Sequence, residues 1–215
     1  PKLKWETVKE FDLGLEFTTL DNKLTGEIDY YRKNVTNALY RILLPSLGFG
    51  AEFLTNAAKV RNEGVELSLG WSNTINTQTR YSIKGNVTYN NNKVKDVGIG
   101  QAYRDGDLGN GSFSTLTTVG QEIGSFYVYK TDGIFQTDAE IAAYPHIAGT
   151  KPGDFKIVDI NKNDTIDERD KYFAGSYQPK VYYGLNLSLN WRQWDFGLDI
   201  FGNAGNKVYN AKKGL

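Results

Sequence analysis

The chain of 215 residues contains no cysteine, so a disulfide framework and a thiolate metal site are both excluded. Its formal net charge is zero, from 25 basic and 25 acidic side chains. No basic stripe interleaved with aromatic residues is present, so nucleic acid is not an expected partner. The sequence also lacks any run of 18 or more apolar residues, which excludes a membrane-spanning helix.

Methionine is missing as well, including from position 1, and the chain starts with Pro1-Lys2-Leu3. This start does not resemble a signal peptide. We therefore expect the chain to be a segment of a longer protein.

The clearest pattern present is an alternation of apolar and polar residues between Val181 and Phe201, interrupted at Arg192-Gln193. Side chains of a strand point alternately to its two faces, so the pattern predicts two strands with one apolar face each. The two apolar series meet at Trp191 and Trp194, where the aromatic belt of a bilayer would lie. Each strand reaches the length of about 9–11 residues that a tilted strand needs to cross the hydrocarbon layer. The segment predicts a hairpin of an outer-membrane β-barrel.

Four more strands with the same alternation precede this hairpin. Their apolar series are Trp5, Phe11, Leu13, Leu15 and Phe17; Leu24, Gly26, Ile28 and Tyr30; Val65, Leu67, Leu69 and Trp71; and Tyr81, Ile83, Val87 and Tyr89. The sequence thus predicts an all-β chain with about six membrane strands in three hairpins. Six strands cannot enclose a wide lumen, so we expect a partial antiparallel transmembrane β-barrel wall that belongs to a larger barrel.

The predicted connections are alternately short and long. Residues 21–23, 72–79 and 192–193 form short turns, whereas 34–58 and 91–178 are long connections. Outer-membrane barrels have short periplasmic turns and long extracellular loops, so we expect 34–58 and 91–178 to be extracellular. A loop as long as 91–178 needs structure of its own, and residues 125–130 predict a strand within it.

A soluble β-sandwich is the alternative fold, because its strands also alternate. Its strands are typically about 5–6 residues long. The apolar faces predicted here run further without interruption, and tryptophan or tyrosine stands at the strand ends. These two features favour the membrane wall.

Residues 159–170 follow the twelve-residue pattern of a calcium-binding loop. The predicted ligands stand at positions 1, 3, 5, 7, 9 and 12 of the pattern and are Asp159, Asn161, Asn163, Thr165 (through its backbone carbonyl), Asp167 and Asp170. Calcium takes about 6–8 oxygen ligands, and this spacing wraps them around one point. Ile166 occupies the apolar position 8 of the pattern.

Two residues depart from the calcium pattern. Asp164 replaces the glycine of position 6, although Asp tolerates a left-handed turn, and Asp170 replaces the longer glutamate of position 12. The alternative is an acidic, solvated turn that uses Asn and Asp for its backbone geometry. If calcium binds, we expect it to neutralise the carboxylates and to rigidify a long outer loop.

No catalytic site is predicted, and we do not expect an enzyme. The pairs Asp195/Asp199 and Glu27/Asp29 resemble the two carboxylates of glycoside hydrolases. They stand on the polar faces of wall strands, however, and we interpret them as lining of the lumen. His146 is the only histidine, and we interpret it as a loop residue. No P-loop, GxSxG or HExxH motif is present.

Several phrases of the sequence form a recognisable set in a fixed order. They are LKWET at 3–7, LTGEIDYY at 24–31, VRNEGVEL at 60–67, GQEIGSFYVYK at 120–130, PGD at 152–154, PKVYYG at 179–184 and FGNAGNKVYN at 201–210. Together they resemble the SusC/RagA family of TonB-dependent outer-membrane transporters. Val128 stands where glycine is frequent in that family. The resemblance extends over essentially the whole chain.

The resemblance implies one β-barrel domain of about 22 strands with a plugged lumen, in the bacterial cell outer membrane. Residues 1–215 would be a late part of its wall, in contact with outer-membrane lipid, and the plug would lie outside this chain. Members of the family import glycan or peptide fragments together with a SusD-like lipoprotein that covers the extracellular mouth. They couple to the TonB complex through an N-terminal region that would also lie outside this chain.

Three functions remain open at this point. The first is an importer, whose loops 34–58 and 91–178 contact the lipoprotein or the cargo. Its loop aromatics either stack on sugar faces or pack within the loop, and they are Phe126, Tyr127, Tyr129 and Phe135. The second is a SusC-like barrel with a structural or export-associated role in a larger envelope complex. The third is a soluble calcium-dependent carbohydrate-binding β module.

Overall fold

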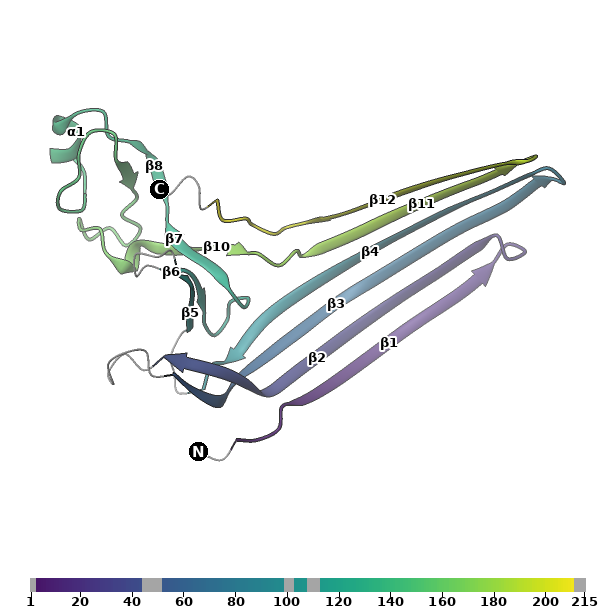
Figure 1. The fold of residues 1–215 in the computed structure, drawn as a ribbon, viewed down its shortest axis with the longest axis horizontal. Helices are drawn as coiled ribbons and strands as arrows, with labels where there is room; N and C mark the ends of the chain where they lie inside the picture. Colours follow the sequence, from purple (N-terminus) through teal and green to yellow (C-terminus); the bar gives the residue numbers. More distant parts are fainter. Residues whose placement is uncertain (1–2, 44–51, 99–102, 108–112, 211–215) are drawn as a thin grey trace.

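The computed structural model describes residues 3–43, 52–98, 103–107 and 113–210. Its main element is a six-stranded antiparallel sheet, in which the strands lie side by side as one layer (Figure 1). The strands, in their spatial order, are β1 (Thr7–Thr19), β2 (Leu24–Leu43), β3 (Glu52–Asn76), β4 (Thr79–Asp96), β11 (Val181–Trp191) and β12 (Trp194–Ala204). The predicted six wall strands in three antiparallel hairpins are confirmed.

One face of this sheet is apolar across its strands. In one cross-strand row the consecutive partners are Leu15, Ile28, Leu67 and Val87. The side chains of this face remain accessible, with Leu15 62% exposed and Leu198 on β12 52% exposed. Apolar surface of this extent calls for a lipid environment, so we name this side of the sheet the lipid face.

The opposite face is polar, and its side chains bond to one another across the strands. The Tyr31 hydroxyl donates a hydrogen bond to Asn90 Oδ1 over 3.0 Å. The Asn186 side-chain amide donates to Asp199 Oδ1 over 2.6 Å. In an outer-membrane barrel the polar face lines the lumen, so we name it the lumenal face.

Aromatic side chains gather on the lipid face near the short turns. Trp191 and Trp194 are direct cross-strand partners on either side of the turn Arg192-Gln193, as predicted. On the neighbouring hairpin, the Trp71 indole donates a hydrogen bond to the Tyr81 hydroxyl over 3.0 Å. These residues form the aromatic belt expected where a wall strand leaves the hydrocarbon layer.

At the end of the sheet away from these turns, the strands are longer than the sequence predicts. Strand β2 continues to Leu43 and β3 begins at Glu52. The prediction that 34–58 is a loop is therefore wrong for residues 34–43 and 52–58. Strand β4 continues to Asp96, so residues 91–96 also belong to the wall strand. The predicted turn 72–79 is likewise shorter, because β3 extends to Asn76 and β4 begins at Thr79.

In the extensions of β2 and β3 the strict alternation of apolar and polar residues is lost, while the backbone pairing continues as far as Leu43 and Glu52. The Arg61 guanidinium donates to Asn34 Oδ1 over 2.9 Å, and Arg32 forms an ion pair of 3.0 Å with Glu63. The ribbon of β2 and β3 then changes register after Val35. A period-two apolar pattern detects only the part of a strand that crosses lipid. For this reason the sequence predicts a loop where β2 and β3 continue beyond the lipid-facing part.

The connection between β4 and β11, residues 97–180, folds into a small domain that we name the loop domain. It contains a four-stranded and a two-stranded sheet, in the orders β10-β7-β6-β5 and β8-β9. Their bounds are β5 (Tyr103–Asp107), β6 (Phe113–Thr117), β7 (Ser125–Tyr129), β8 (Thr131–Ile134), β9 (Phe155–Ile157) and β10 (Lys171–Ser176), with a 3-10 turn at Glu168–Asp170. The predicted strand at 125–130 is confirmed as β7. One short helix is present, α1 (Asp138–Ala142), and no helix of the described residues is long and apolar enough to cross a membrane.

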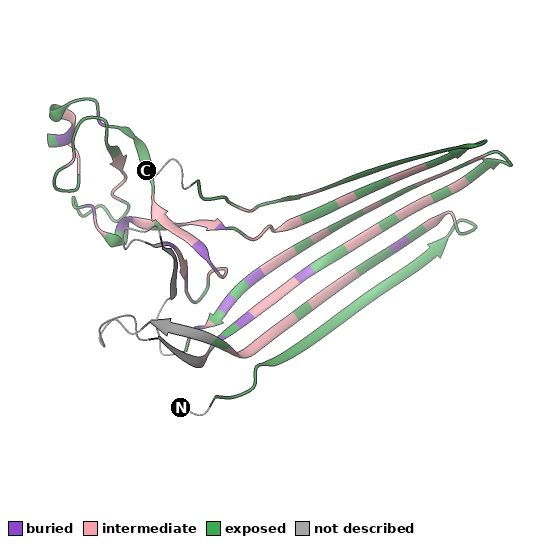
Figure 2. Cartoon of the chain, in the orientation of Figure 1, coloured by how far each residue is buried: buried purple, intermediate pink, exposed green. Residues whose placement is uncertain are grey.

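The loop domain is attached to the end of β4 that lies away from the short turns, and we call this end of the wall the rim. The backbone N–H of Val94 donates to the Gln121 carbonyl over 2.8 Å, and the Gly120 N–H donates to the Val94 carbonyl over 2.9 Å. The Ile123 N–H donates to Asn92 Oδ1 over 2.9 Å. Figure 2 shows that buried residues of the sheet gather near this end. The loop domain therefore rests on the rim of the wall.

Candidate functional site

The lumenal face carries a concavity of about 610 Å3 that spans the six wall strands. Each strand contributes three consecutive residues, of which the first and the third stand on the lumenal face. The side chains with charged or amide groups are Glu16, Glu27, Lys84, Asn86, Asn186 and Asp199. A concave, polar and accessible wall is suited to contact water, a solute or another part of the protein within a barrel.

Negative charge predominates on the lumenal face of β1, β2 and β3. Glu16 and Glu27 are direct cross-strand partners, and so are Asp29 and Glu66. Like charges directly opposite each other on a sheet are destabilising. Positively charged groups in the lumen would therefore be favoured next to this part of the lumenal face.

The predicted carboxylate pairs lie on the lumenal face, as the alternation indicates. The Asp195 carboxylate accepts a hydrogen bond from the Asn190 amide, and Asp199 accepts one from Asn186. Both carboxylates are thus held by amides of the neighbouring strand β11. This arrangement fits a wall lining.

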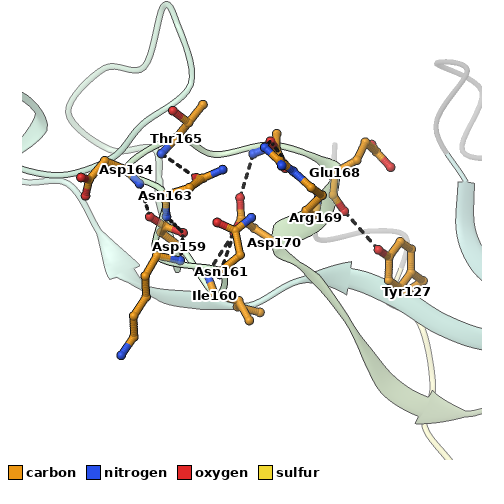
Figure 3. Close-up of polar contacts among 12 residues, drawn as sticks. Tyr127, Asp159, Ile160, Asn161, Asn163, Asp164, Thr165, Glu168, Arg169 and Asp170 are labelled. Atoms are coloured by element: carbon orange, nitrogen blue, oxygen red, sulfur yellow. Dashed lines mark hydrogen bonds and ion pairs between the residues drawn. The ribbon is translucent and has the colours of Figure 1, made fainter.

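The predicted calcium loop, residues 159–170, is a closed turn of the loop domain between β9 and β10 (Figure 3). The Asp159 carboxylate begins it, with Oδ1 accepting the Lys162 N–H over 2.7 Å and Oδ2 accepting the Asp164 N–H over 2.7 Å. Lys162 and Asp164 have φ angles of 59° and 60°. The left-handed conformation that the pattern requires at position 6 is therefore adopted by Asp164.

Asp170 closes the turn from its other end. Its side chain is fully buried, and its Oδ1 accepts the N–H groups of Ile160 and Asn161 over 3.0 and 3.3 Å. Its Oδ2 accepts the Asp167 N–H over 2.8 Å. Hydrogen bonds to the charged carboxylate, first that from the Asp167 N–H, lower the pKa of Asp170 below its ordinary value.

The remaining predicted ligands surround the same turn. Asn163 Oδ1 accepts the Thr165 N–H over 3.0 Å. Asp167 forms an ion pair of 2.6 Å with Arg169, and the hydrogen bond from that guanidinium lowers the pKa of the Asp167 carboxyl. All six predicted ligand residues thus belong to one closed turn.

No group of three or more His, Cys, Asp and Glu side chains is placed to hold a metal ion in the part of the chain that the structure describes. A calcium ion in the turn 159–170 would therefore need the asparagine oxygens and the backbone carbonyl that the pattern assigns. Calcium binding stays a prediction.

The four aromatic residues considered for sugar stacking contact other side chains of the chain. Phe135 is only 1% exposed. The rings of Phe126 and Tyr209 stack at 6.4 Å, those of Tyr127 and Phe173 lie 4.9 Å apart, and Lys171 Nζ lies 5.0 Å from the Tyr129 ring. These contacts favour packing as the role of all four residues. His146 is exposed, and its Nδ1 lies 2.8 Å from the Tyr144 carbonyl oxygen, which agrees with a loop residue.

The sequence did not reveal the ion pair between Glu122 and Lys180, the last residue of the loop domain, whose backbone bonds to Asn90 of β4 and to Ala204 of β12. Lys180 Nζ lies 2.9 Å from Glu122 Oε1, and the Glu122 side chain is 14% exposed. The hydrogen bond with Glu122 raises the pKa of Lys180. The sequence places Lys180 directly before a wall strand, which indicates a location near the rim. It does not indicate the partner Glu122, because that residue is distant in the sequence.

Known proteins similar in sequence match nearly the whole chain. The TonB-dependent receptor P3 of Formosa agariphila is 28% identical over 213 aligned positions, in an alignment that covers 97% of this chain and 21% of that protein. The TonB-dependent receptor SusC of Bacteroides thetaiotaomicron is 27% identical over 215 aligned positions, in an alignment that covers 96% of this chain and 20% of the relative. The chain thus spans about a fifth of the length of these relatives.

Solved structures with the same fold include two of a RagAB complex. The structure described as the RagAB peptide transporter superposes with a TM-score of 0.72 at 20% identity, over 94% of this chain and 21% of that chain. The RagAB peptide importer in its "open-open" state superposes with a TM-score of 0.73 at 22% identity, over 96% of this chain and 21% of that chain.

The family described as "TonB dependent receptor-like, beta-barrel" matches residues 1–161. This match covers well over half of the chain, and it includes four of the six wall strands. The family match, the similarity to SusC and the shared fold with the RagAB structures agree with the alternating strands, the aromatic belt and the polar lumenal face. All of these are features of an outer-membrane β-barrel wall. The chain belongs to the TonB-dependent receptor family of bacterial outer-membrane β-barrels.

Proposed function

We propose that this chain forms part of the wall and an extracellular loop domain of an importer of glycan or peptide fragments. The observation that carries the proposal is the extent of the similarity to the SusC and RagAB proteins, which includes the loop domain as well as the wall strands. A shared membrane wall alone would support only the barrel. A shared loop domain at its mouth also supports a shared use of that mouth.

The partner that we propose is a SusD-like lipoprotein on the extracellular side. The RagAB structures are described as a peptide transporter or importer, which supports peptide as one class of cargo. The resemblance to the SusC/RagA family supports glycan as the other class. Energy coupling to the TonB complex is expected from parts of the protein outside residues 1–215, because the chain spans only about a fifth of its relatives.

The parts of the chain have separate roles in this proposal. The lipid face holds the barrel in the membrane, and the lumenal face supplies a hydrated wall for the path of the cargo. The loop domain, held to the rim by Lys180 and Glu122, presents its outer surface to the lipoprotein or the cargo. The family comprises transporters and not enzymes, so no catalytic step is assigned to the carboxylates of the lumenal face.

Membership of an outer-membrane barrel family removes the soluble β-sandwich and the soluble carbohydrate-binding module as alternatives. The export-associated barrel differs from the importer in its partners, and no described residue favours it. The two functions are therefore best separated by identifying what the intact protein binds.

The test is mass spectrometry of the full-length protein, extracted gently from outer membranes with its bound molecules. We expect a lid lipoprotein to copurify in a defined ratio, together with a glycan or peptide. Copurification of secretion or motility components without a small ligand would contradict the importer. A deletion of the gene for the copurified lipoprotein serves as the control, and it should abolish retention of the ligand.

A further inference from the structure

A row of cationic side chains crosses the outer side of the wall just beyond its apolar part. Lys9 of β1 pairs with Asn34 of β2, Asn34 pairs with Arg61 of β3, and Arg61 pairs with Lys93 of β4. Each of these residues stands an even number of positions from apolar residues of the lipid face in its own strand, so all four belong to that face. We name Lys9, Arg61 and Lys93 the cation row.

The cation row lies at the height where the hydrocarbon layer ends. On β3, Arg61 is ten positions from Trp71, which belongs to the aromatic belt near the short turns. With a rise of about 3.4 Å per residue and a tilt of about 40°, this separation corresponds to roughly 26 Å along the membrane normal. The apolar band of a barrel is about 25 Å tall, and its long loops are extracellular. The cation row therefore stands at the level of the headgroups of the outer leaflet.

Aromatic side chains mark the same boundary from the apolar side. Tyr30 of β2 and Tyr89 of β4 stand in one cross-strand row of the lipid face, two rows from the cation row. In the row between them, the Arg32 guanidinium carbon lies over the Tyr30 ring, 5.8 Å from its centroid. Tyrosine is enriched where a membrane meets water, and long cationic side chains extend from there to the headgroups. The order of apolar, tyrosine and cationic residues is thus that of a membrane boundary.

The charge of the cation row is not neutralised within the described wall. Arg61 and Lys93 are direct cross-strand partners, and like charges in this arrangement are destabilising. The nearby carboxylate of Glu63 is already paired with Arg32 over 3.0 Å. Among the residues that the structure describes, no carboxylate forms an ion pair with any member of the cation row. An anion from the surroundings of the barrel would relieve this repulsion.

We propose that the cation row binds the phosphate-bearing headgroup of an outer-leaflet lipid on the outside of the barrel. Asn34 Oδ1 accepts a hydrogen bond from Arg61 Nε over 2.9 Å and so fixes the guanidinium, whose planar donors suit a phosphate. Lys9 and Lys93 are exposed on either side of it. The row crosses three gaps between strands, or about 14 Å, which is wide enough for a headgroup that contains sugars. Its continuity with the lipid face favours a lipid over a free ion.

The test is native mass spectrometry of the full-length protein, purified in detergent and titrated with lipid A, the phosphate-bearing membrane anchor of lipopolysaccharide. We expect lipid A to bind at least about ten-fold more tightly than the same lipid after enzymatic removal of its phosphate. Inorganic phosphate at millimolar concentration should not displace the lipid. Both comparisons use the unaltered protein, so they do not depend on the insertion of a variant. They are also independent of the proposed cargo and lipoprotein.

Two double variants locate the binding on the protein. Lys9→Gln/Lys93→Gln should weaken the binding of lipid A by about thirty-fold, which corresponds to about 1 kcal/mol for each basic side chain near a membrane surface. Lys33→Gln/Lys84→Gln is the matched control, because it removes the same charge from the lumenal face, which lipid does not reach. The control should leave the binding of lipid A unchanged.

Four results would overturn the proposal. Equal affinities for lipid A with and without phosphate would reject a phosphate site, and displacement by inorganic phosphate would assign the cation row to a free ion. Equal losses in the two double variants would place the lipid elsewhere on the protein. Disulfide-linked dimers of a Lys93→Cys variant in outer membranes would show that a second copy of the protein, and not lipid, covers the row.

Discussion

Substitution of Leu187 by arginine tests the assignment of the two faces most directly. Leu187 lies on the lipid face of β11, between its direct partners Ile83 and Leu198. It is four residues from Trp191, which marks the aromatic belt. With a rise of about 3.4 Å per residue and a tilt of about 40°, this separation corresponds to roughly 10 Å along the membrane normal.

The expected loss follows from this depth. The apolar band of a barrel is about 25 Å tall, so Leu187 lies near the bilayer midplane, where arginine costs about 2–4 kcal/mol. Leu187→Arg should therefore lower the free energy of unfolding of the full-length protein by that amount. Trp191→Arg should cost only about 0–1 kcal/mol, because the charge stands at the interface.

The matched control is Ser188→Arg, one position further along the same strand. Ser188 is on the lumenal face, between the small residues Ser82 and Gly197, so the arginine can extend into the hydrated lumen. We expect a change within about 0.5 kcal/mol. The assay is reversible unfolding in guanidinium of the full-length protein in lipid vesicles, followed by tryptophan fluorescence. Equal losses for Leu187→Arg and Ser188→Arg, or a larger loss for Ser188→Arg, would refute the assigned faces.

Three further predictions concern the loop domain. Calorimetry on the intact protein should detect calcium binding that is lost in Asp159→Ala/Asp170→Ala, and absence of heat at millimolar calcium would reject the site. Because its folded pKa lies below the ordinary value of 3.8, Asp170 should stabilise the turn 159–170 above that pH and stop doing so as the pH falls through the folded pKa. The hydrogen-exchange protection of the Ile160 and Asp167 amides should thus be constant between about pH 5 and 7, and it should decrease at pH values below about 4. Protection that persists at lower pH would contradict the stabilising role of the Asp170 carboxylate. Glu122→Gln should return the raised pKa of Lys180 toward 10.5. It should lower the protection of the Val94 amide by about five-fold, which corresponds to roughly 1 kcal/mol for an ion pair whose lysine is 44% exposed. An unchanged Lys180 pKa would disprove the pair.

The sequence predicts those parts of the fold that depend on contact with lipid. Each wall strand must present an apolar residue at every second position, and this constraint is visible without any tertiary information. The pairing of Trp191 with Trp194 follows from the two-residue turn between them, because turn length sets the register of a hairpin. The closed turn 159–170 is also local, since the Asp159 and Asp170 carboxylates accept backbone N–H groups of residues 160–167, inside the same segment.

The parts that sequence reasoning missed depend on contacts between distant residues. Residues 34–43 and 52–58 continue the pairing of β2 with β3 past two register shifts, after Val35 and after Ala38, so the apolar residues there do not keep a period of two. Glu122 and Lys180 are far apart in sequence, and neither has a local signal that names its partner. Val8, Val35, Val60 and Val94 interrupt the polar parity of the wall strands in the sequence, but their direct pairing across four strands depends on the register of those strands.

The distribution of buried residues separates the roles of the wall and of the loop domain. The buried apolar side chains are Ala58, Val60, Val94 and Val97 at the rim and Phe135, Ile141 and Ile166 in the loop domain. Between the rim and the short turns, no large apolar side chain of the described wall is buried within this chain. Stabilisation there must come from lipid on one face, from the contents of the lumen on the other, and from strands that pair with the edges β1 and β12. Substitutions in the wall should therefore impair insertion of the whole barrel, whereas substitutions in the loop domain should impair binding while the barrel remains in the membrane.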